Sequence, residues 1–92
     1  MNLTKITKAK FLKHLKEGNT AFMKKQRSWQ KISFYWEGSE QWFMNKIYDK
    51  RVDGEVKPDV GKSVWIIAKD LPHHIDHLER QGYNYYIDKE NE

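Results

Sequence analysis

Apolar residues recur along the chain with two periods, and each period predicts a type of secondary structure. Near the N-terminus they lie three and four residues apart, which is the spacing of one helix face. Thr7 is a typical N-cap residue, and Gly18 is a typical residue just after a helix end. We therefore expect a helix over residues 8–17 whose buried stripe is Phe11, Leu12 and Leu15.

Residues 20–25 and 28–36 show the alternation of two strands, with Gln26 and Arg27 in a tight connection. In the second strand, successive side chains point to opposite faces of the sheet. One face therefore carries Ile32, Phe34 and Trp36, and we expect it to face the core. The other face carries Trp29, Lys31, Ser33 and Tyr35.

Residues 37–40 predict a turn, and the segment that follows, residues 41–52, is compatible with two structures. Ser39 is suited to cap a helix there, but aromatic enrichment and the short connection favour a third strand, which we prefer. Asp53-Gly54 is typical of a hairpin turn, and Pro58, Asp59 and Gly61 predict a loop.

The last third of the chain predicts a strand, a helix and a further strand. Residues 63–68 hold a continuous apolar run, which is typical of a strand buried on both faces. Asp70 is suited to cap a helix over residues 71–81, with Gly82 closing it. A final strand covers residues 83–87, and residues 88–92 form an acidic, frayed tail. The two strands are either neighbours in a βαβ-like unit or separated in the sheet.

These elements predict a single α+β domain over residues 1–92. It has an N-terminal helix, a mainly antiparallel sheet of four or five strands, and a second helix before the last strand. The expected core is Phe11, Leu12, Leu15, Ile32, Phe34, Trp36, Ile47, Val64, Ile66, Ile75, Leu78 and Ile87.

Composition agrees with a folded chain and narrows its class. Apolar residues make up 38% and charged residues 33% of the 92 positions, and the apolar ones come in runs. The absence of cysteine excludes disulfides and thiolate metal sites. No segment has the pattern of a signal peptide or a membrane span, so we expect a cytoplasmic location and no membrane partner.

Charge is distributed unevenly between the two parts of the chain. Residues 1–36 carry nine lysine or arginine residues against one acid, Glu17, whereas residues 37–92 carry eight against twelve acids. The first part therefore has a net charge of +8 and the second −4. This asymmetry indicates an anionic partner for the first part, with nucleic acid the leading candidate. The alternative is a lysine-rich surface that only aids solubility.

Catalytic motifs are missing from the sequence. Neither Ser33 nor Ser63 lies in a nucleophile elbow, and the glycines are isolated, so no phosphate-binding loop is predicted. His73 and His77 have a spacing that allows a shared metal ion, but a zincin glutamate is missing, and an exposed polar helix face is the more ordinary interpretation. We expect no enzyme activity, cofactor or native metal.

Binding of nucleic acid, with single strands favoured, is the leading functional hypothesis. Lysine and arginine alternate with aromatic rings across the hairpin of residues 20–36, and rings between cations suit stacked bases. No complete nucleic-acid-binding motif is present, and burial of either ring under the first helix would remove the surface. The candidate binding residues are Lys10, Lys13, Lys24, Lys25, Arg27, Trp29, Lys31 and Tyr35.

Binding to a protein is the second hypothesis. Exposed tryptophan, tyrosine and arginine are typical of interface hot spots, and the acidic, tyrosine-rich C-terminal end is suited to a basic protein surface or to the basic part of a second copy. A short, cysteine-free chain rich in lysine and asparagine also suits an inhibitor or adaptor of phage or plasmid origin that acts on a host protein. A homodimer is compatible with either hypothesis.

Overall fold

The computed structural model describes residues 2–26, 28–38, 40–52 and 55–89. Its elements follow the order β1 (Leu3–Ile6), α1 (Lys8–Lys16), β2 (Ala21–Lys25), β3 (Ser28–Glu37), β4 (Gln41–Val52), β5 (Glu55–Ile67), the short 3₁₀ helix η1 (Ala68–Asp70), α2 (Leu71–Arg80) and β6 (Asn84–Asp88). The expected α+β class is therefore confirmed. The described residues form six strands, rather than four or five, and two α-helices.

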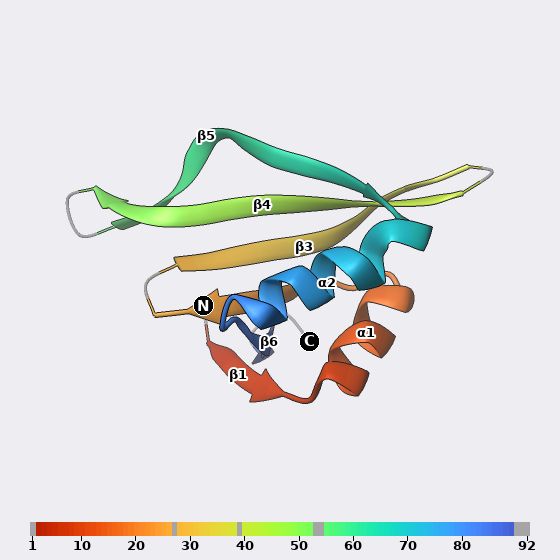
Figure 1. Ribbon diagram of the computed structural model, residues 1–92, viewed down its shortest axis with the longest axis horizontal. Coiled ribbons are helices and arrows are strands. Elements are labelled where there is room, and N and C mark those ends of the chain that lie inside the picture. The colour runs from red at the N-terminus through yellow and green to blue at the C-terminus, as the bar shows by residue number, and fades with distance from the viewer. Residues whose placement is uncertain (1, 27, 39, 53–54, 90–92) are drawn as a thin grey trace.

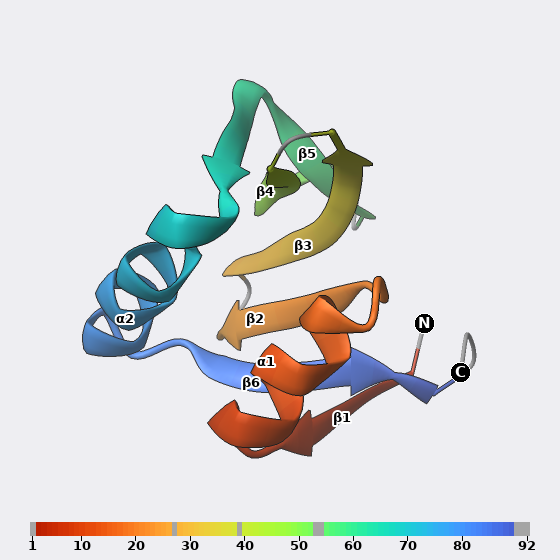
Figure 2. The same ribbon diagram turned by 90° about the vertical axis from the view of Figure 1, so that its right-hand side faces the viewer.

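The strands form one sheet in the order β1-β6-β2-β3-β4-β5, and every neighbouring pair is antiparallel. β2, β3, β4 and β5 follow one another along the chain and pair in that order as a meander, whereas α1 and α2 lie in crossover connections. Both helices lie on the same face of the sheet, as the two views in Figures 1 and 2 show. The sheet therefore has one covered face and one face without helices.

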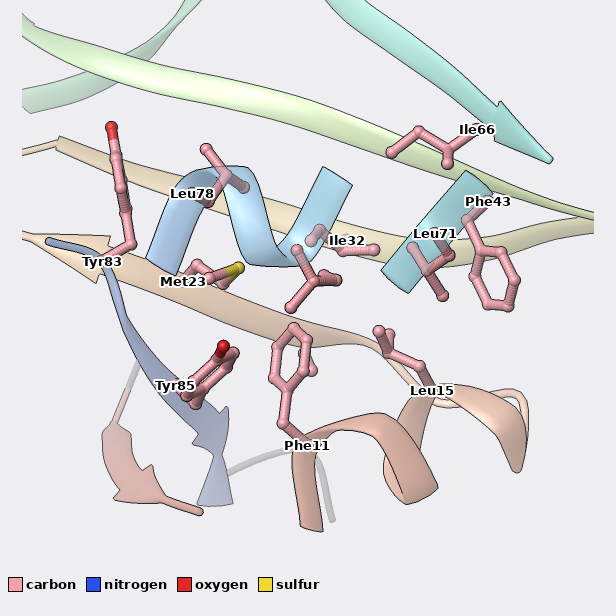
Figure 3. Packing of buried hydrophobic residues seen from close by; sticks show 12 residues of the cluster. Phe11, Leu15, Met23, Ile32, Phe43, Ile66, Leu71, Leu78, Tyr83 and Tyr85 are labelled. Atoms are coloured by element: carbon pink, nitrogen blue, oxygen red, sulfur yellow. The ribbon is translucent and has the colours of Figure 1, made fainter. Parts of the chain in front are cut away.

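The hydrophobic core lies between the helices and the covered face. α1 contributes Phe11 and Leu15, and α2 contributes Ile75 and Leu78 to the same cluster (Figure 3). The ring of Phe11 lies 4.9 Å from that of Tyr85 on β6. Burying each large side chain contributes roughly 1.5–3 kcal/mol. The sheet completes the cluster with Ala21, Met23, Ile32, Phe43, Ile66 and Tyr85, and Tyr83 adds to it from just before β6.

α1 begins and ends at the residues that the sequence predicts. The side chain of Thr7 accepts a hydrogen bond from the backbone N–H of Lys10 at 3.2 Å, which satisfies one of the free amides of the first turn. Gly18, directly after the C-cap, has a φ of +88°, a conformation that costs glycine little. For α2, Asp70 occupies the N-cap position but its side chain makes no capping hydrogen bond.

A small polar cluster ties the two helices together. The Lys8 amine at the start of α1 pairs with Asp76 and lies 2.9 Å from Glu79, both on α2. Tyr85 donates a hydrogen bond to Glu79. The hydrogen bonds that Lys8 donates to Asp76 and Glu79 raise the pKa of Lys8. Burial, followed by the hydrogen bond that Tyr85 donates to Glu79, raises the pKa of Tyr85. Both groups therefore keep their protons at neutral pH.

The prediction for residues 63–68 is wrong in one respect. Residues 63–67 belong to β5 and Ala68 begins η1, but β5 is the edge strand of the sheet, so the segment is not buried on both faces. Val64, expected in the core, is 41% exposed. β5 and β6 are not neighbours, because β4, β3 and β2 lie between them. A continuous apolar run does not distinguish a central strand from an edge strand, since both pack at least one face.

Other expectations from the sequence are confirmed only in part. Residues 41–52 form a strand, as preferred, and the backbone of residues 58–61 is strand rather than loop. Asp88, expected in a frayed tail, ends β6 and is buried. Of the expected core, Leu12 and Phe34 are partly buried against the cluster, and Ile47 is half-buried. The side chain of Trp36 and the turn at residues 53–54 lie outside the described part of the structure.

Candidate functional site

The strand register assigns each side chain to one face of the sheet, because directly opposed residues share a face. The face without helices is named the open face. Three rows of Cα partners cross it: Lys24, Trp29 and Tyr48; Phe22, Lys31, Lys46 and Ser63; and Ser33, Met44 and Trp65. Beyond β2, the second row continues through Tyr86 on β6 to Lys5 on β1.

The first aromatic cluster of the open face lies over β2, β3 and β4. The rings of Trp29 and Tyr48 are stacked, with centroids 4.1 Å apart and planes 4° from parallel. Phe22 packs against Trp29 at 5.7 Å. Phe22 is buried, whereas Trp29 and Tyr48 are only half-buried. Trp29 therefore packs against both Phe22 and Tyr48, and the cluster leaves parts of Trp29 and Tyr48 exposed.

The second aromatic cluster is a pair of exposed rings on β3 and β5. Tyr35 and Trp65 meet edge to face with centroids 4.1 Å apart, and they are 52% and 51% exposed. Tyr35 lies where the β3–β4 register shifts, between Phe34 and Trp36. An irregular step of this kind redirects a side chain, and here the Tyr35 ring reaches β5, two strands away. The open face therefore carries rings at both ends of β3.

Lysines lie between the two clusters. Lys31 and Lys46 are directly opposed on β3 and β4, an arrangement of like charges that destabilises a sheet. Lys24 and Lys5 add further positive charge to this face. Among the described residues, none of these four amines takes part in an ion pair. Asp88 on β6 also lies on this face, where it is buried and accepts a hydrogen bond from the Asn2 backbone at 3.1 Å.

The structure brings together half of the residues predicted to bind nucleic acid. Lys24, Trp29 and Lys31 lie on the open face, and Tyr35 joins them through its contact with Trp65. Lys25 is on the helix-covered side of β2, in register with Ser28. Lys10 and Lys13 are exposed on α1, across the sheet from the open face. Arg27 lies outside the described residues.

Among the residues of this surface that the sequence hypothesis did not include are Phe22, Lys46, Tyr48 and Trp65. Lys46 and Tyr48 alternate with Asn45 and Ile47 along β4, so their shared face was visible once a strand was assumed. Which face it was depended on pairing with β3. Trp65 lay inside an apolar run and gave no sign of being exposed.

A groove of about 780 Å³ lies between the end of β5 and α2. Its apolar side is formed by Val64, Ile66 and Ile67, and its polar side by Asp70, His73 and His77. The Nε2 atom of His77 lies 2.9 Å from the Gln81 side-chain amide. Within the described ranges, no three histidine, aspartate or glutamate side chains are grouped to hold a metal ion.

Beneath α2, three polar side chains are joined inside the structure. The Asn45 amide donates to Gln30 Oε1 at 2.6 Å and lies 2.8 Å from His74 Nε2. Gln30 and Asn45 are buried, and Asn45 Oδ1 has no described hydrogen-bond partner. Burial, then the nearby His77 and His73, lowers the pKa of His74. His74 therefore favours the neutral form, in which Nε2 accepts the amide hydrogen.

No protein-family model matches this chain, and no curated protein or solved structure is similar to it at a significant level. Neither α1 nor α2 has the length and apolar character that a membrane-spanning helix requires, and this holds for every helix within the described ranges.

Proposed function

We propose that this protein binds single-stranded nucleic acid on the open face of its sheet. One observation carries the proposal: the opposed pair Lys31 and Lys46 lies between two aromatic clusters on a face that no helix covers. Two amines facing each other cost folding free energy. An anionic ligand that bridges them removes this cost and supplies a physical reason for the arrangement.

The chemistry of the open face matches an unpaired strand better than a duplex. Exposed rings stack on splayed bases, each contributing about 1–3 kcal/mol, whereas bases inside a duplex do not present their faces. Lysines next to the rings neutralise phosphates without reading sequence. From Trp29 to Tyr35, β3 extends about 20 Å, which several nucleotides of an extended strand cover.

The role we propose is binding and regulation in the cytoplasm, without catalysis. The side chains that we propose as contacts carry rings and amines, the groups that hold a polyanion in place. The proposed contacts are Lys24, Trp29, Lys31, Tyr35, Lys46, Tyr48 and Trp65, with Phe22 supporting Trp29.

Fluorescence anisotropy with labelled DNA and RNA tests this proposal. We expect tighter binding to single strands than to duplexes, and a steep loss of affinity between about 50 and 200 mM salt, because each phosphate contact releases a counterion. Trp29→Ala weakens binding by about 1–3 kcal/mol, whereas Trp29→Phe, which keeps a ring, loses less. The proposal is refuted if neither single-stranded DNA nor single-stranded RNA binds detectably at the lower salt concentration.

A host-protein partner is the second candidate, favoured by the exposed Tyr35–Trp65 pair, since both residue types are common in interface hot spots. Binding of this kind depends on apolar contact and survives moderate salt. Affinity capture at about 200 mM salt, a concentration that weakens phosphate contacts, distinguishes it. Loss of one captured protein with Tyr35→Ala favours the second candidate.

A further inference from the structure

β5 is the last strand of the sheet, so one side of its backbone faces no other strand in the described part of the chain. An edge of this type presents unpaired N–H and C=O groups to any extended segment that approaches. Natural sheets usually protect such edges with proline, lysine, irregular pairing or short length.

The two halves of β5 differ in this protection. In the first half, Pro58 lacks an N–H, and the register with β4 shifts on both sides of Tyr48, its Cα partner. From Ser63 to Ile67, pairing with β4 is regular as far as the structure describes it. This second half exposes Val64 and Trp65, two of the three large exposed hydrophobic side chains among the described residues. The second half is thus an unprotected apolar edge.

The opposite edge of the sheet does not share this character. β1 has four residues, and Lys5 is exposed at its middle. Beyond the end of β6, the backbone N–H of Lys89 donates a hydrogen bond to the carbonyl oxygen of Asn2 at 3.1 Å, next to the β1–β6 pairing. Exposed apolar edge is therefore concentrated on β5.

We propose that β5 pairs with β5 of a second copy of this chain, antiparallel, about a two-fold axis that passes beside Trp65. A two-fold interface brings the same patch together from both copies, so the patch must be complementary to itself. In this register Trp65 opposes Trp65 of the second copy, and Val64 opposes Ile66. Apolar side chains then meet apolar side chains on both faces.

Strand geometry restricts the alternatives. A two-fold axis perpendicular to the sheet keeps the helix layers of both copies on the same side, and directly opposed residues must point to the same face. This excludes Val64 opposite Trp65, because successive residues point to opposite faces. A shift of two residues places Lys62 opposite Ile66 and Ser63 opposite Trp65. A shift of two residues in the other direction places Val64 opposite Ala68, which lies in η1 beyond the end of β5. The proposed register buries both exposed side chains, Val64 and Trp65, against apolar partners within the paired strands.

The groove beside β5 has a place in this arrangement. Val64 and Ile66 line it from the strand and His73 and His77 line it from α2. Val64 and Ile66 of the second copy, on the same face as α2, would enter the space between β5 and α2. The pairing also joins the two open faces into one continuous surface. The proposed dimer does not rest on the proposed function, because association of the two copies is measured without nucleic acid.

Sedimentation equilibrium of the full chain, at protein concentrations up to about 100 μM because association follows mass action, tests the proposal. We expect twice the chain mass of 11.1 kDa. Val64→Lys places a charge on the edge and should give a monomer, whereas Val64→Thr, of similar size and uncharged, should remain a dimer. Val64 is already 41% exposed, so the lysine variant should keep the wild-type circular dichroism. Its melting temperature should equal that of the wild type at protein concentrations low enough to dissociate the dimer, because association itself stabilises the fold.

Disulfide trapping tests the register, because the chain has no other cysteine. Trp65→Cys places two thiols at the two-fold axis, within the Cα separation of about 4.4–6.8 Å that a disulfide needs. In Ser63→Cys the two thiols lie four residues apart along the strands, about 13 Å. Rapid cross-linking of the first variant and not the second supports the proposal. The proposal is overturned if the wild type is a monomer, or if Val64→Lys leaves a dimer intact. If the monomer instead binds an unrelated extended peptide along β5, the edge serves another partner and the proposal is likewise overturned.

Discussion

The two faces of the sheet are built from alternate residues of the same strands, yet they differ in what covers them. On β3, Ile32 is completely buried beneath the helices, whereas its neighbour Lys31 points to the open face beside Lys46. On β4, Phe43 lies in the core, and Tyr48, on the other face, stacks on Trp29. Rings are abundant on both faces, so ring content alone does not identify a core.

The difference between the faces lies in the neighbours of the rings. Core rings such as Phe11 and Tyr85 are surrounded by aliphatic side chains from two helices. Rings of the open face touch one another and lie next to lysines. We infer that side chains of the covered face contribute most of the folding stability, and that side chains of the open face contact the proposed ligand. Substitutions on each face separate these roles.

The largest expected effect comes from truncating a core side chain on the covered face. Ile75→Ala removes a completely buried side chain from α2, and should lower the free energy of unfolding by about 2–5 kcal/mol because less apolar area is buried and a cavity remains. Urea titration followed by circular dichroism measures it. Tyr35→Ala, on the open face, removes one exposed ring pair and should cost less than about 1.5 kcal/mol. Equal losses of stability in the two variants would contradict the division of roles.

A pH effect should arise beneath α2. The lowered pKa of His74 means that the folded protein takes up this proton less readily than the unfolded chain, whose histidine has the ordinary value of 6.5. Below that value the unfolded state binds more protons, so stability should fall as the pH decreases. Thermal melts between about pH 7.5 and 5.5 measure this.

His74→Gln provides the matched variant, because glutamine keeps an amide oxygen as an acceptor for Asn45 and does not titrate. It should reduce the loss of stability on acidification. His73→Gln, at an exposed neighbouring position, should retain that loss. The account of the buried polar chain fails if the two variants behave alike.

The smallest expected effect is a gain in stability on the open face. Lys31→Gln removes one of two opposed amines and should stabilise the fold by about 0.2–1 kcal/mol, while weakening nucleic-acid binding. Lys5→Gln is the control, since Lys5 opposes Tyr86 rather than a cation. A loss of stability in Lys31→Gln would remove the reason for regarding the lysine pair as functional.

Local patterns in the sequence predicted the parts of the fold that depend on a single segment. Thr7, Gly18 and the spacing of Phe11 and Leu15 defined α1, and alternation along β3 placed Trp29 and Lys31 together. β1 was missed because four residues carry too short an alternation. The contribution of Tyr48 and Lys46 required the β3–β4 register, which depends on long-range packing.

Trp65 shows the limit of local patterns most clearly. Its apolar neighbours, Val64 and Ile66, gave the pattern of a buried strand, and only the strand order of the sheet reveals that the segment is an edge. Lys10 and Lys13 show the same limit from the opposite direction. They are basic and near Lys24 in sequence, but the fold places them on α1, across the sheet from the open face.

This separation allows the sharpest test of the open face as the binding surface. The double variants Lys31→Gln/Lys46→Gln and Lys10→Gln/Lys13→Gln remove the same charge from opposite sides of the molecule. The measurement is the slope of log affinity for a single-stranded oligonucleotide against log salt concentration, whose magnitude decreases by about one for each phosphate that the protein no longer neutralises. We predict a decrease of about two for the first variant, and almost none for the second. Equal slopes for the two variants would contradict this assignment, because binding would then follow net charge rather than one face of the sheet.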